Sequence, residues 1–407
     1  MSLTVAEQKV VSWLDTQKEA MIALLAELVN ADSGSYDKQG VDAAGEVLKR
    51  FFATHGLAIE TVPHAEFGEA IKATLPHPPS NDQRPIVLMG HRDTVFPKGE
   101  PQRRPFTITD GRATGPGVMD MKGGLVLNAF VAAALARLEE RPGPLTLLVT
   151  SDEEIASPSS RPVIEAVARD ARCVFNSEPS KTPQLGQRFT EEKKQVVTHG
   201  RKGGVFMRFE IAGKAAHSGA AYERGVSAIL DLAKKVALLH ALTNLEEGVT
   251  VNVGLIGGGQ TVNTVAPSAW GEIDLRYVRA EQREALLKQI RHIVETPMVP
   301  GATGVLIIKG EFLPLEQSAE AKAMLDTFRG AASEFGYEVS TQFTGGCADS
   351  GFTAAQGCPT LCSVGPIGAG GHTPEEYLDV DSLVPCVKTL ALAVMRVSDA
   401  LPKDRAA

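Results

Sequence analysis

Short apolar runs alternate with stretches of helical periodicity along the first part of the chain. The runs at residues 86–89, 145–150 and 173–175 predict buried strands, and residues 123–138 predict a helix. A strand buried on both faces is apolar at successive positions, whereas a helix repeats its apolar positions about every three to four residues. Strands and helices in alternation are typical of a doubly wound α/β sheet.

The N-terminal residues 1–30 have the pattern of one amphipathic helix, in which Val10, Leu14 and Leu25 fall on helical spacing. Acidic side chains, among them Glu19, interrupt the apolar positions. A secretory signal or a membrane-spanning helix needs a longer unbroken apolar stretch, so we expect neither here.

The pattern changes near residue 203. The predicted order is then strand, helix, strand, strand, helix, strand, over residues 205–211, 226–242, 250–256, 269–278, 281–295 and 305–309. This β-α-β-β-α-β order is that of the ferredoxin-like fold. The first pattern then resumes with a helix, a strand and a helix at 318–335, 360–364 and 382–397.

We therefore expect one α/β domain with a mixed sheet, formed by residues 1–202 and 313–407. A smaller ferredoxin-like domain, residues 203–312, is expected to interrupt it. The 407 residues are long enough for two such cores.

Charge and cysteine content narrow the classes of partner. The formal net charge is -8 and no long basic run occurs, so we expect neither nucleic acid nor anionic membrane as a partner. Five cysteines without a CxxC pair do not make a disulfide framework, and Cys358 and Cys362 flank an apolar run typical of buried thiols. We expect a reducing, cytoplasmic location.

Potential metal ligands gather where predicted core strands end. They follow a strand, or lie in a glycine-rich loop or turn, at His91, Asp93, Asp120, Glu153, Glu154, Glu178 and His372. Open α/β sheets place their binding crevice beyond the carboxyl ends of the strands. Two histidines and several carboxylates at one edge predict a site for a divalent metal such as zinc.

Each of these residues also has a simpler interpretation. A histidine after a strand is most often structural or exposed, paired glutamates such as Glu153 and Glu154 usually lie in a solvated loop, and Asp120 alone is an ordinary turn residue. His91 and Asp93 are more informative as a pair. Side chains two residues apart on extended backbone point the same way, which suits a carboxylate that fixes the tautomer of a ligand histidine.

The motifs that carry these residues occur along the chain in the order HRDTV (91–95), GPGVMDMKGG (115–124), SDEE (151–154), SEPS (177–180), GKAAHSG (213–219), TVNTVAP (261–267) and GHT (371–373). Together they resemble the zinc-dependent family that contains glutamate carboxypeptidase, acetylornithine deacetylase, succinyl-diaminopimelate desuccinylase and aminoacylase. The resemblance covers nearly the whole chain and is greatest to the glutamate carboxypeptidase branch.

The resemblance implies a centre of two zinc ions, for which cobalt or manganese are possible substitutes. Asp120 would bridge the two ions. His91 and Glu178 would complete one site, and Glu154 and His372 the other.

The resemblance also implies how the centre acts. Asp93 would orient His91, and the peptide bond after Asp120 would be cis. Glu153 would be the general base, which takes a proton from a water between the metals and passes it to the leaving nitrogen.

In this family the inserted domain mediates homodimerisation and acts as a lid. His217 matches a residue that reaches the partner subunit's active site and stabilises the tetrahedral intermediate, and Asn263 matches a residue that contacts the substrate there. Arg276 matches a residue that holds a substrate carboxylate. We expect the lid to hinge near Gly203 and Phe312.

The implied substrate is a dipeptide or an N-acyl amino acid with a free carboxylate. Carboxypeptidases and deacylases of this kind carry Glu at the position of Glu178, where aminopeptidases carry Asp. Glutamate carboxypeptidase has a second substrate-binding arginine where this chain has Glu311 or Lys309. Because a carboxylate there would repel a glutamyl side chain, glutamate specificity does not follow.

Two other functions stay open at this point. The same fold can hydrolyse another C–N bond, in a carbamoyl, amidine or aryl-amine substrate. A scaffold without activity is the alternative from another class, although this chain has a residue of the required type at every matching position.

Overall fold

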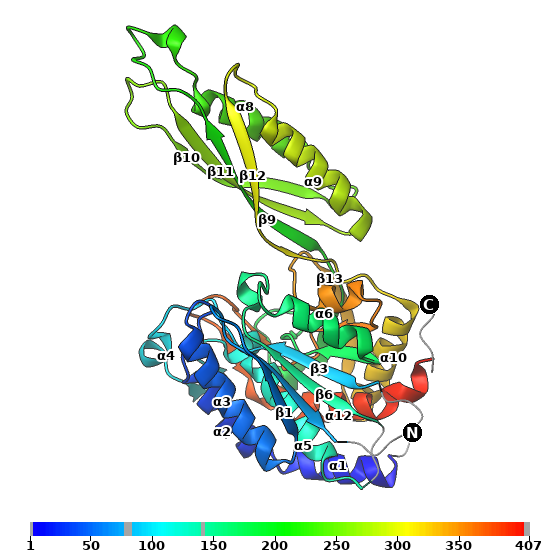
Figure 1. Ribbon diagram of the computed structural model, residues 1–407. Coiled ribbons are helices and arrows are strands. Elements are labelled where there is room, and N and C mark those ends of the chain that lie inside the picture. The colour runs from blue at the N-terminus through cyan, green and yellow to red at the C-terminus, as the bar shows by residue number, and fades with distance from the viewer. Residues whose placement is uncertain (1–2, 77–83, 140–142, 403–407) are drawn as a thin grey trace. The chain divides into compact units, whose positions relative to one another are not determined.

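The computed structural model describes residues 3–76, 84–139 and 143–402, which divide into two compact units (Figure 1). The larger unit comprises Met1–Gly200, Gln317–Phe343 and Phe352–Ala407. The smaller unit comprises Arg201–Glu316 and Thr344–Gly351. The exact domain boundaries that the sequence suggested stay a prediction: residues 1–202 and 313–407 for one domain, and residues 203–312 for the other.

The larger unit is built on an eight-stranded mixed sheet of order β1-β2-β6-β3-β7-β14-β8-β13. The strands are β1 (Ala58–Val62), β2 (Ala70–Leu75), β3 (Ile86–His91), β6 (Leu145–Thr150), β7 (Cys173–Asn176), β8 (Lys194–Arg201), β13 (Glu338–Thr344) and β14 (Thr360–Cys362). Strands β6, β3, β7 and β14 are parallel to their neighbours in that run. Their carboxyl ends therefore meet at one edge of the sheet.

Helices of the larger unit include three that the apolar periodicity predicted: α5 (Gly124–Leu135), α10 (Ala319–Ser333) and α12 (Leu383–Ala400). The α/β class and the predicted buried strands are likewise confirmed, with ends that differ by a few residues. Further elements are α3 (Lys38–Thr54), α4 (Glu100–Arg103), α6 (Arg161–Asp170), α7 (Phe189–Glu192) and α11 (Ser350–Ala355).

The prediction of one N-terminal helix was wrong. Two helices, α1 (Val5–Asp15) and α2 (Lys18–Val29), are separated at Thr16 and Gln17. The Thr16 N–H donates to Trp13 O and the Gln17 N–H donates to Leu14 O, both one residue short of the α-helical spacing. Apolar positions recur on both sides of this break, which is why the period alone did not reveal it.

The stretch Val118–Ala136, which contains α5, is long and apolar enough to cross a membrane. Within the protein, however, 89% of its most apolar window is buried. The core helix of a globular domain has the same properties.

The smaller unit has the ferredoxin-like order that the sequence predicted. Its elements are β9 (Gly203–Ala212), α8 (Ala228–His240), β10 (Thr250–Gly258), β11 (Ser268–Tyr277), α9 (Ala280–Glu295) and β12 (Thr303–Phe312). The antiparallel sheet has the order β10-β11-β9-β12. Alternate residues of β11 are buried beneath the two helices.

A third sheet, of four short strands, lies in the larger unit. Its order is β15-β16-β5-β4, with β4 (Thr107–Thr109), β5 (Arg112–Thr114), β15 (Gly368–Ala369) and β16 (Tyr377–Asp379). Strand β5 directly precedes the glycine-rich turn at 115–124, and the β15–β16 connection contains residues 370–376. This sheet thereby holds two segments together that are far apart in the sequence.

Candidate metal centre

Four of the predicted site residues lie at the carboxyl edge of the parallel strands. His91 is the last residue of β3, Glu153 and Glu154 begin a 3-10 turn just after β6, and Glu178 follows β7. All four side chains are about nine-tenths buried or more. The short third sheet adds Asp120 and His372 to this group.

Asp120 lies between two histidines and uses one carboxylate oxygen for each. His91 Nε2 is 3.2 Å from Asp120 Oδ1 and 3.7 Å from Glu178 Oε1. His372 Nε2 is 3.3 Å from Asp120 Oδ2 and 3.1 Å from Glu154 Oε2. The five side chains therefore form two His–Glu pairs on either side of one shared carboxylate.

Asp93 orients both His91 and the loop after β6. His91 Nδ1 lies 3.1 Å from the Asp93 carbonyl oxygen and 3.4 Å from its carboxylate. A neutral ring that donates its Nδ1–H there keeps the lone pair of Nε2 for a ligand. The Asp93 carboxylate also accepts the backbone N–H groups of Glu153 and Glu154, at 3.1 and 3.2 Å.

Two supporting residues were missed in the sequence. The Ser35 hydroxyl donates to the buried Asp93 carboxylate at 2.7 Å. Glu376 is fully buried and accepts the backbone N–H groups of Gly117, Met119 and Asp120 at 2.8–3.0 Å. Glu376 therefore holds the turn that presents Asp120, and its one sequence signal is the acidic pair that closely follows His372.

Unusual backbone geometry is concentrated around these side chains. The Asp120–Met121 peptide bond is cis, as the resemblance implied. His372, Ala156 and Ser157 have φ values of 65°, 70° and 52°. Non-glycine residues rarely adopt this left-handed region, and where they do so they cluster at functional sites.

The electrostatic environment of the cluster favours bound positive charge. Burial would lower the pKa of His91, but hydrogen bonds with Asp120 and Asp93 raise it well above its ordinary value. Hydrogen bonds with Asp120 and Glu154 raise the pKa of His372 to about 10. Burial raises the pKa of Glu154 to about 7. A bound cation would take the place of the protons that these groups hold.

The donor set fits a divalent metal. One ligand atom each from His91, Asp120 and Glu154 lie within 4.8 Å of one another. His91 Nε2 is buried and faces this space, 3.2 Å from Asp120 Oδ1. Imidazole and carboxylate ligands are typical of zinc sites.

The other three predicted residues lie in the smaller unit, in two separate places. His217 and Asn263 are on neighbouring exposed loops, because His217 pairs with Thr264 in a β-bridge. Arg276 lies near the far end of β11, where Asp274 accepts from its Nε at 2.8 Å and Cys347 Sγ lies 2.7 Å from its Nη1. These three residues are not brought together within the smaller unit.

Glu311 does not occupy the place that its alignment suggested. It is paired in register with Val205, which is buried beneath the helices, and Arg283 of α9 donates to its carboxylate at 2.9 Å. Arg276 is on the opposite, partly exposed face of the sheet. Arg283 thus neutralises the Glu311 carboxylate on that face, and the expectation about glutamate specificity stays a prediction.

A sequence profile for peptidase family M20/M25/M40 matches residues 87–396. This match spans most of the chain and includes every predicted site residue. The protein belongs to this peptidase family.

Individual M20-family relatives support the same assignment. The chain is 29% identical over 380 residues to carboxypeptidase G2 of a Pseudomonas species, an alignment that covers 90% of this chain and 86% of the relative. It is 26% identical over 408 residues to acetylornithine deacetylase of Edwardsiella ictaluri, which covers 91% of this chain and 96% of the relative. This protein is therefore a metal-dependent hydrolase of the metallopeptidase and deacylase kind.

Solved structures show the same fold. An M20-family metallo-carboxypeptidase from Sulfolobus solfataricus superposes with a TM-score of 0.74 at 19% identity, over 93% of this chain and 99% of that one. A dinuclear metal-binding M20-family peptidase from Bacillus subtilis superposes with a TM-score of 0.66 at 15% identity, over 95% of this chain and 100% of that one.

Proposed function

We propose that this M20-family enzyme uses two zinc ions to cleave the amide bond of a dipeptide or an N-acyl amino acid with a free carboxylate. The observation that carries the proposal is the position of Asp120 between two His–Glu pairs, with one oxygen toward each histidine. A carboxylate that bridges two metals needs this arrangement. The dinuclear relative from Bacillus subtilis agrees with it.

The distances between the five proposed ligands assign them to two metal sites. His91 and Glu178 would complete one metal site on the Oδ1 side of Asp120, and Glu154 and His372 the other site on the Oδ2 side. When bound, the two ions would polarise the amide carbonyl and lower the pKa of water at the site. Cobalt or manganese would be accepted by the same ligands.

Glu153 would be the general base. Its carboxylate is nearly buried and lies 3.9 Å from His91 Nε2, so it faces the ligand cluster without belonging to either His–Glu pair. The Glu153 backbone N–H donates to the Asp93 carboxylate, and this hydrogen bond fixes the position of the Glu153 backbone. From there Glu153 would take a proton from water and deliver it to the leaving nitrogen.

Arg276 would bind the free carboxylate of the substrate. Its guanidinium is on the open face of the smaller unit's sheet, 5.1 Å from the Phe206 ring centroid. Asp274 accepts hydrogen bonds from two of its nitrogens, at 2.8 and 3.2 Å. A substrate carboxylate would therefore share the guanidinium with Asp274 or displace it.

His217 and Asn263 would act in the active site of a partner subunit. Their loops adjoin Ser268 at the start of β11, whereas Arg276 lies eight residues further along, roughly 26 Å away at about 3.3 Å per residue. Side chains this far apart on one rigid sheet do not bind the same small substrate. In a homodimer, His217 of one subunit would instead enter the active site of the other subunit.

The dimer contact would form on one side of the smaller unit. Strand β10 is an edge of its sheet and exposes Leu255 and Ile256. Helix α8 packs against β10 and exposes Ile229, Leu230 and Leu238. Apolar side chains next to an unpaired strand edge are typical of a subunit interface. The lid hinge near Gly203 and Phe312 remains part of this proposal.

The location we propose is the cytoplasm. The five cysteines form no disulfide within the described residues, and Cys358 and Cys362 are buried as the sequence predicted. Buried cysteines without disulfides agree with a reducing compartment.

The decisive experiment compares Glu153→Gln with the unchanged protein, both loaded with zinc, on N-acyl amino acids and dipeptides. Turnover should fall by at least about a hundredfold, since a general base contributes that much, while the metal content stays the same. Glu338→Gln, on the exposed β13, is the matched control and should keep full activity. Unchanged turnover by Glu153→Gln would contradict the assigned base.

A further inference from the structure

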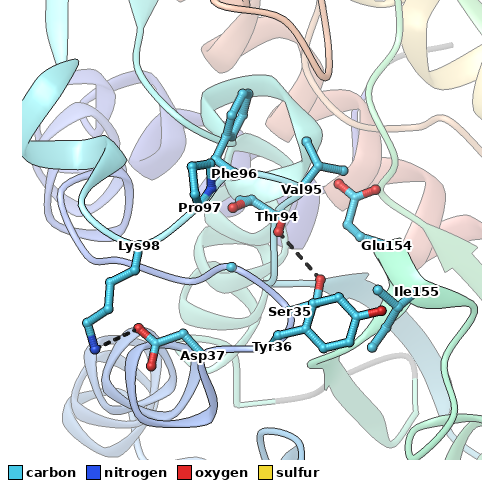
Figure 2. Close-up of a pocket in the computed structure, with 11 residues that line it drawn as sticks. Ser35, Tyr36, Asp37, Thr94, Val95, Phe96, Pro97, Lys98, Glu154 and Ile155 are labelled. Atoms are coloured by element: carbon cyan, nitrogen blue, oxygen red, sulfur yellow. Dashed lines mark hydrogen bonds and ion pairs between the residues drawn. The ribbon is translucent and has the colours of Figure 1, made fainter.

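A pocket of about 680 Å³ opens in the larger unit next to the candidate metal centre. Three loops line it: the α2–α3 connection, the residues that follow β3, and the 3-10 turn after β6 (Figure 2). Glu154 is part of its wall and is also the carboxylate 3.1 Å from His372 Nε2. A substrate whose scissile bond lies at the metal centre would therefore extend into this pocket.

The wall is mostly apolar. Tyr36, Val95 and Ile155 line it together with Phe96 and Pro97 (Figure 2). The Tyr36 side chain is 81% exposed and Val95 43% exposed, although both lie on segments that are otherwise held firmly. Apolar surface of this kind gains most from a ligand group that removes it from water.

The two loops beneath the pocket are fixed to each other by backbone contacts. The Ser35 N–H donates to Thr94 O at 3.2 Å, and the Thr94 N–H donates to Ser33 O at 2.8 Å. A Cβ atom on Gly34 would lie 2.4 Å from Phe96 O, so only glycine permits this close approach. The pocket is thus formed in advance, and a ligand does not have to order it.

The charges in the lining argue against an anionic ligand. Lys98 Nζ lies 3.1 Å from Asp37 Oδ2, so the cation of the lining already has a carboxylate partner. The other charged side chain is the Glu154 carboxylate, which would be a ligand of the proposed metal. A second carboxylate in the substrate would therefore find no surplus positive charge here.

We propose that this pocket binds the acyl group of the substrate, and that it selects uncharged, apolar acyl groups of the size of an aromatic ring or larger. This inference rests on the proposed function, because it takes the amide bond to lie beside Glu154. It adds a substrate class, since it assigns Tyr36, Val95 and Ile155 to recognition of the acyl side.

The test measures binding rather than turnover. N-benzoyl-, N-acetyl- and N-succinyl-L-alanine are titrated calorimetrically into zinc-loaded Glu153→Gln protein, which is expected to bind them without cutting them. Burial of an aromatic ring predicts that the benzoyl compound binds about tenfold or more tightly than the acetyl compound. The succinyl compound should bind no more tightly than the acetyl compound.

Two further substitutions locate the effect. Tyr36→Ser removes an exposed ring, and Val95→Asp adds a charge to the wall; each should reduce the benzoyl preference to less than about threefold. Leu185→Ser is the matched control, because Leu185 is 73% exposed in the same unit and lies outside the lining. Its preference should equal that of the parent protein.

The outcomes separate the two claims. Equal binding of the benzoyl and acetyl compounds, tighter binding of the succinyl compound, or a preference that survives both Tyr36→Ser and Val95→Asp would overturn the pocket assignment. If the unchanged enzyme hydrolyses N-acetyl-L-alanine at the same time, the proposed function stands without it. If it hydrolyses none of these compounds and no dipeptide, the proposed function is wrong and the assignment of the pocket to an acyl group fails with it; a benzoyl preference that depends on Tyr36 would then show only a pocket for apolar groups.

Discussion

At the scale of single residues, the position of Asp120 depends on a carboxylate far away in the sequence. Glu376 accepts three backbone N–H groups of the turn that carries Asp120. These are charge-assisted hydrogen bonds in a buried place, so the turn loses its support if the charge is removed. Residues that orient a ligand commonly affect metal affinity as much as some ligands do.

We therefore expect Glu376→Gln to weaken zinc binding by about 10- to 100-fold. The amide keeps one acceptor oxygen, but its NH₂ group faces backbone N–H donors and repels them. Competition of the protein with a chromophoric chelator measures the affinity. Glu375→Gln changes the exposed neighbour and should bind zinc as the parent does; equal affinities of both variants would refute this role of Glu376.

The sequence revealed the candidate ligands because each follows a recognisable strand or glycine-rich turn. His91, Glu154 and Glu178 could be found from where apolar runs end. Ser35 and Glu376 could not, because their hydrogen bonds join segments whose proximity is set only by the folded sheet. The pairing of Glu311 with Arg283 could not be predicted either, because it depends on which face of the strand each side chain takes.

At the scale of elements, helix α5 supports the loop that carries Glu178. At the start of the helix, a Cβ atom on Gly124 would lie 1.9 Å from Ser177 O. The Ser177 hydroxyl also donates to Asn128 Oδ1 within α5, at 2.6 Å. The glycine therefore lets the helix approach the backbone just before Glu178.

Gly124→Ala should lower the free energy of unfolding by about 1–3 kcal/mol, because the backbone of the loop must move away. Gly330→Ala is the matched control. Gly330 is an exposed residue of α10, and an added Cβ there meets nothing within 4 Å. Alanine should there raise the free energy of unfolding by about 0.5–1 kcal/mol. Denaturant titration of both variants measures the two values, and a Gly124→Ala protein as stable as the parent would disprove the close packing.

Helix α1 is attached to α12 by the buried Glu7. Its Oε1 accepts from Arg396 Nε at 2.6 Å, and its Oε2 accepts the Thr4 N–H at 2.8 Å. Burial acts to raise the pKa of Glu7, but the interactions with Arg396 and Thr4 outweigh it and hold the pKa below its ordinary value of 4.5. The unfolded chain thus binds a proton at this position more readily than the folded one.

The stability that Glu7 contributes should be present above pH 4.5 and should be lost as the pH falls through its lowered folded-state pKa. Glu7→Gln should accordingly destabilise the protein by about 1 kcal/mol or less at pH 7. The difference from the parent should disappear in acid. Thermal unfolding at a series of pH values measures it, and a difference that grows toward low pH would have the wrong sign.

Elements with a clear apolar period were predicted well, and those without one were not. The buried strands β3, β6 and β7 are apolar throughout. Strand β13 lies at an edge of the sheet and is partly exposed along its whole length, so it has no continuous apolar run. Neighbouring strands decide its conformation, which a single sequence does not show.

At the scale of the whole molecule, the account requires two copies of the chain. The His217 loop and Arg276 lie at opposite ends of β11, so the site that we propose would take His217 from a second subunit. The exposed apolar side chains of α8 and β10 would provide the surface for the proposed association.

Leu255→Asp should convert the dimer to monomers, because it places a charge within that surface. Val305→Asp is matched in exposure, with Val305 58% and Leu255 57% exposed, but lies on β12 at the opposite edge of the sheet. This control should remain dimeric. Sedimentation velocity distinguishes the species, and a parent protein that sediments as a monomer would contradict the shared site.

The central claim is that the larger unit binds two metal ions with Asp120 between them. Anomalous diffraction at the zinc absorption edge, from crystals of the zinc-loaded enzyme, tests it most directly. We predict two peaks about 3.5–4 Å apart, one beside His91 and Glu178 and the other beside Glu154 and His372. A single peak, or peaks away from Asp120, would contradict the account.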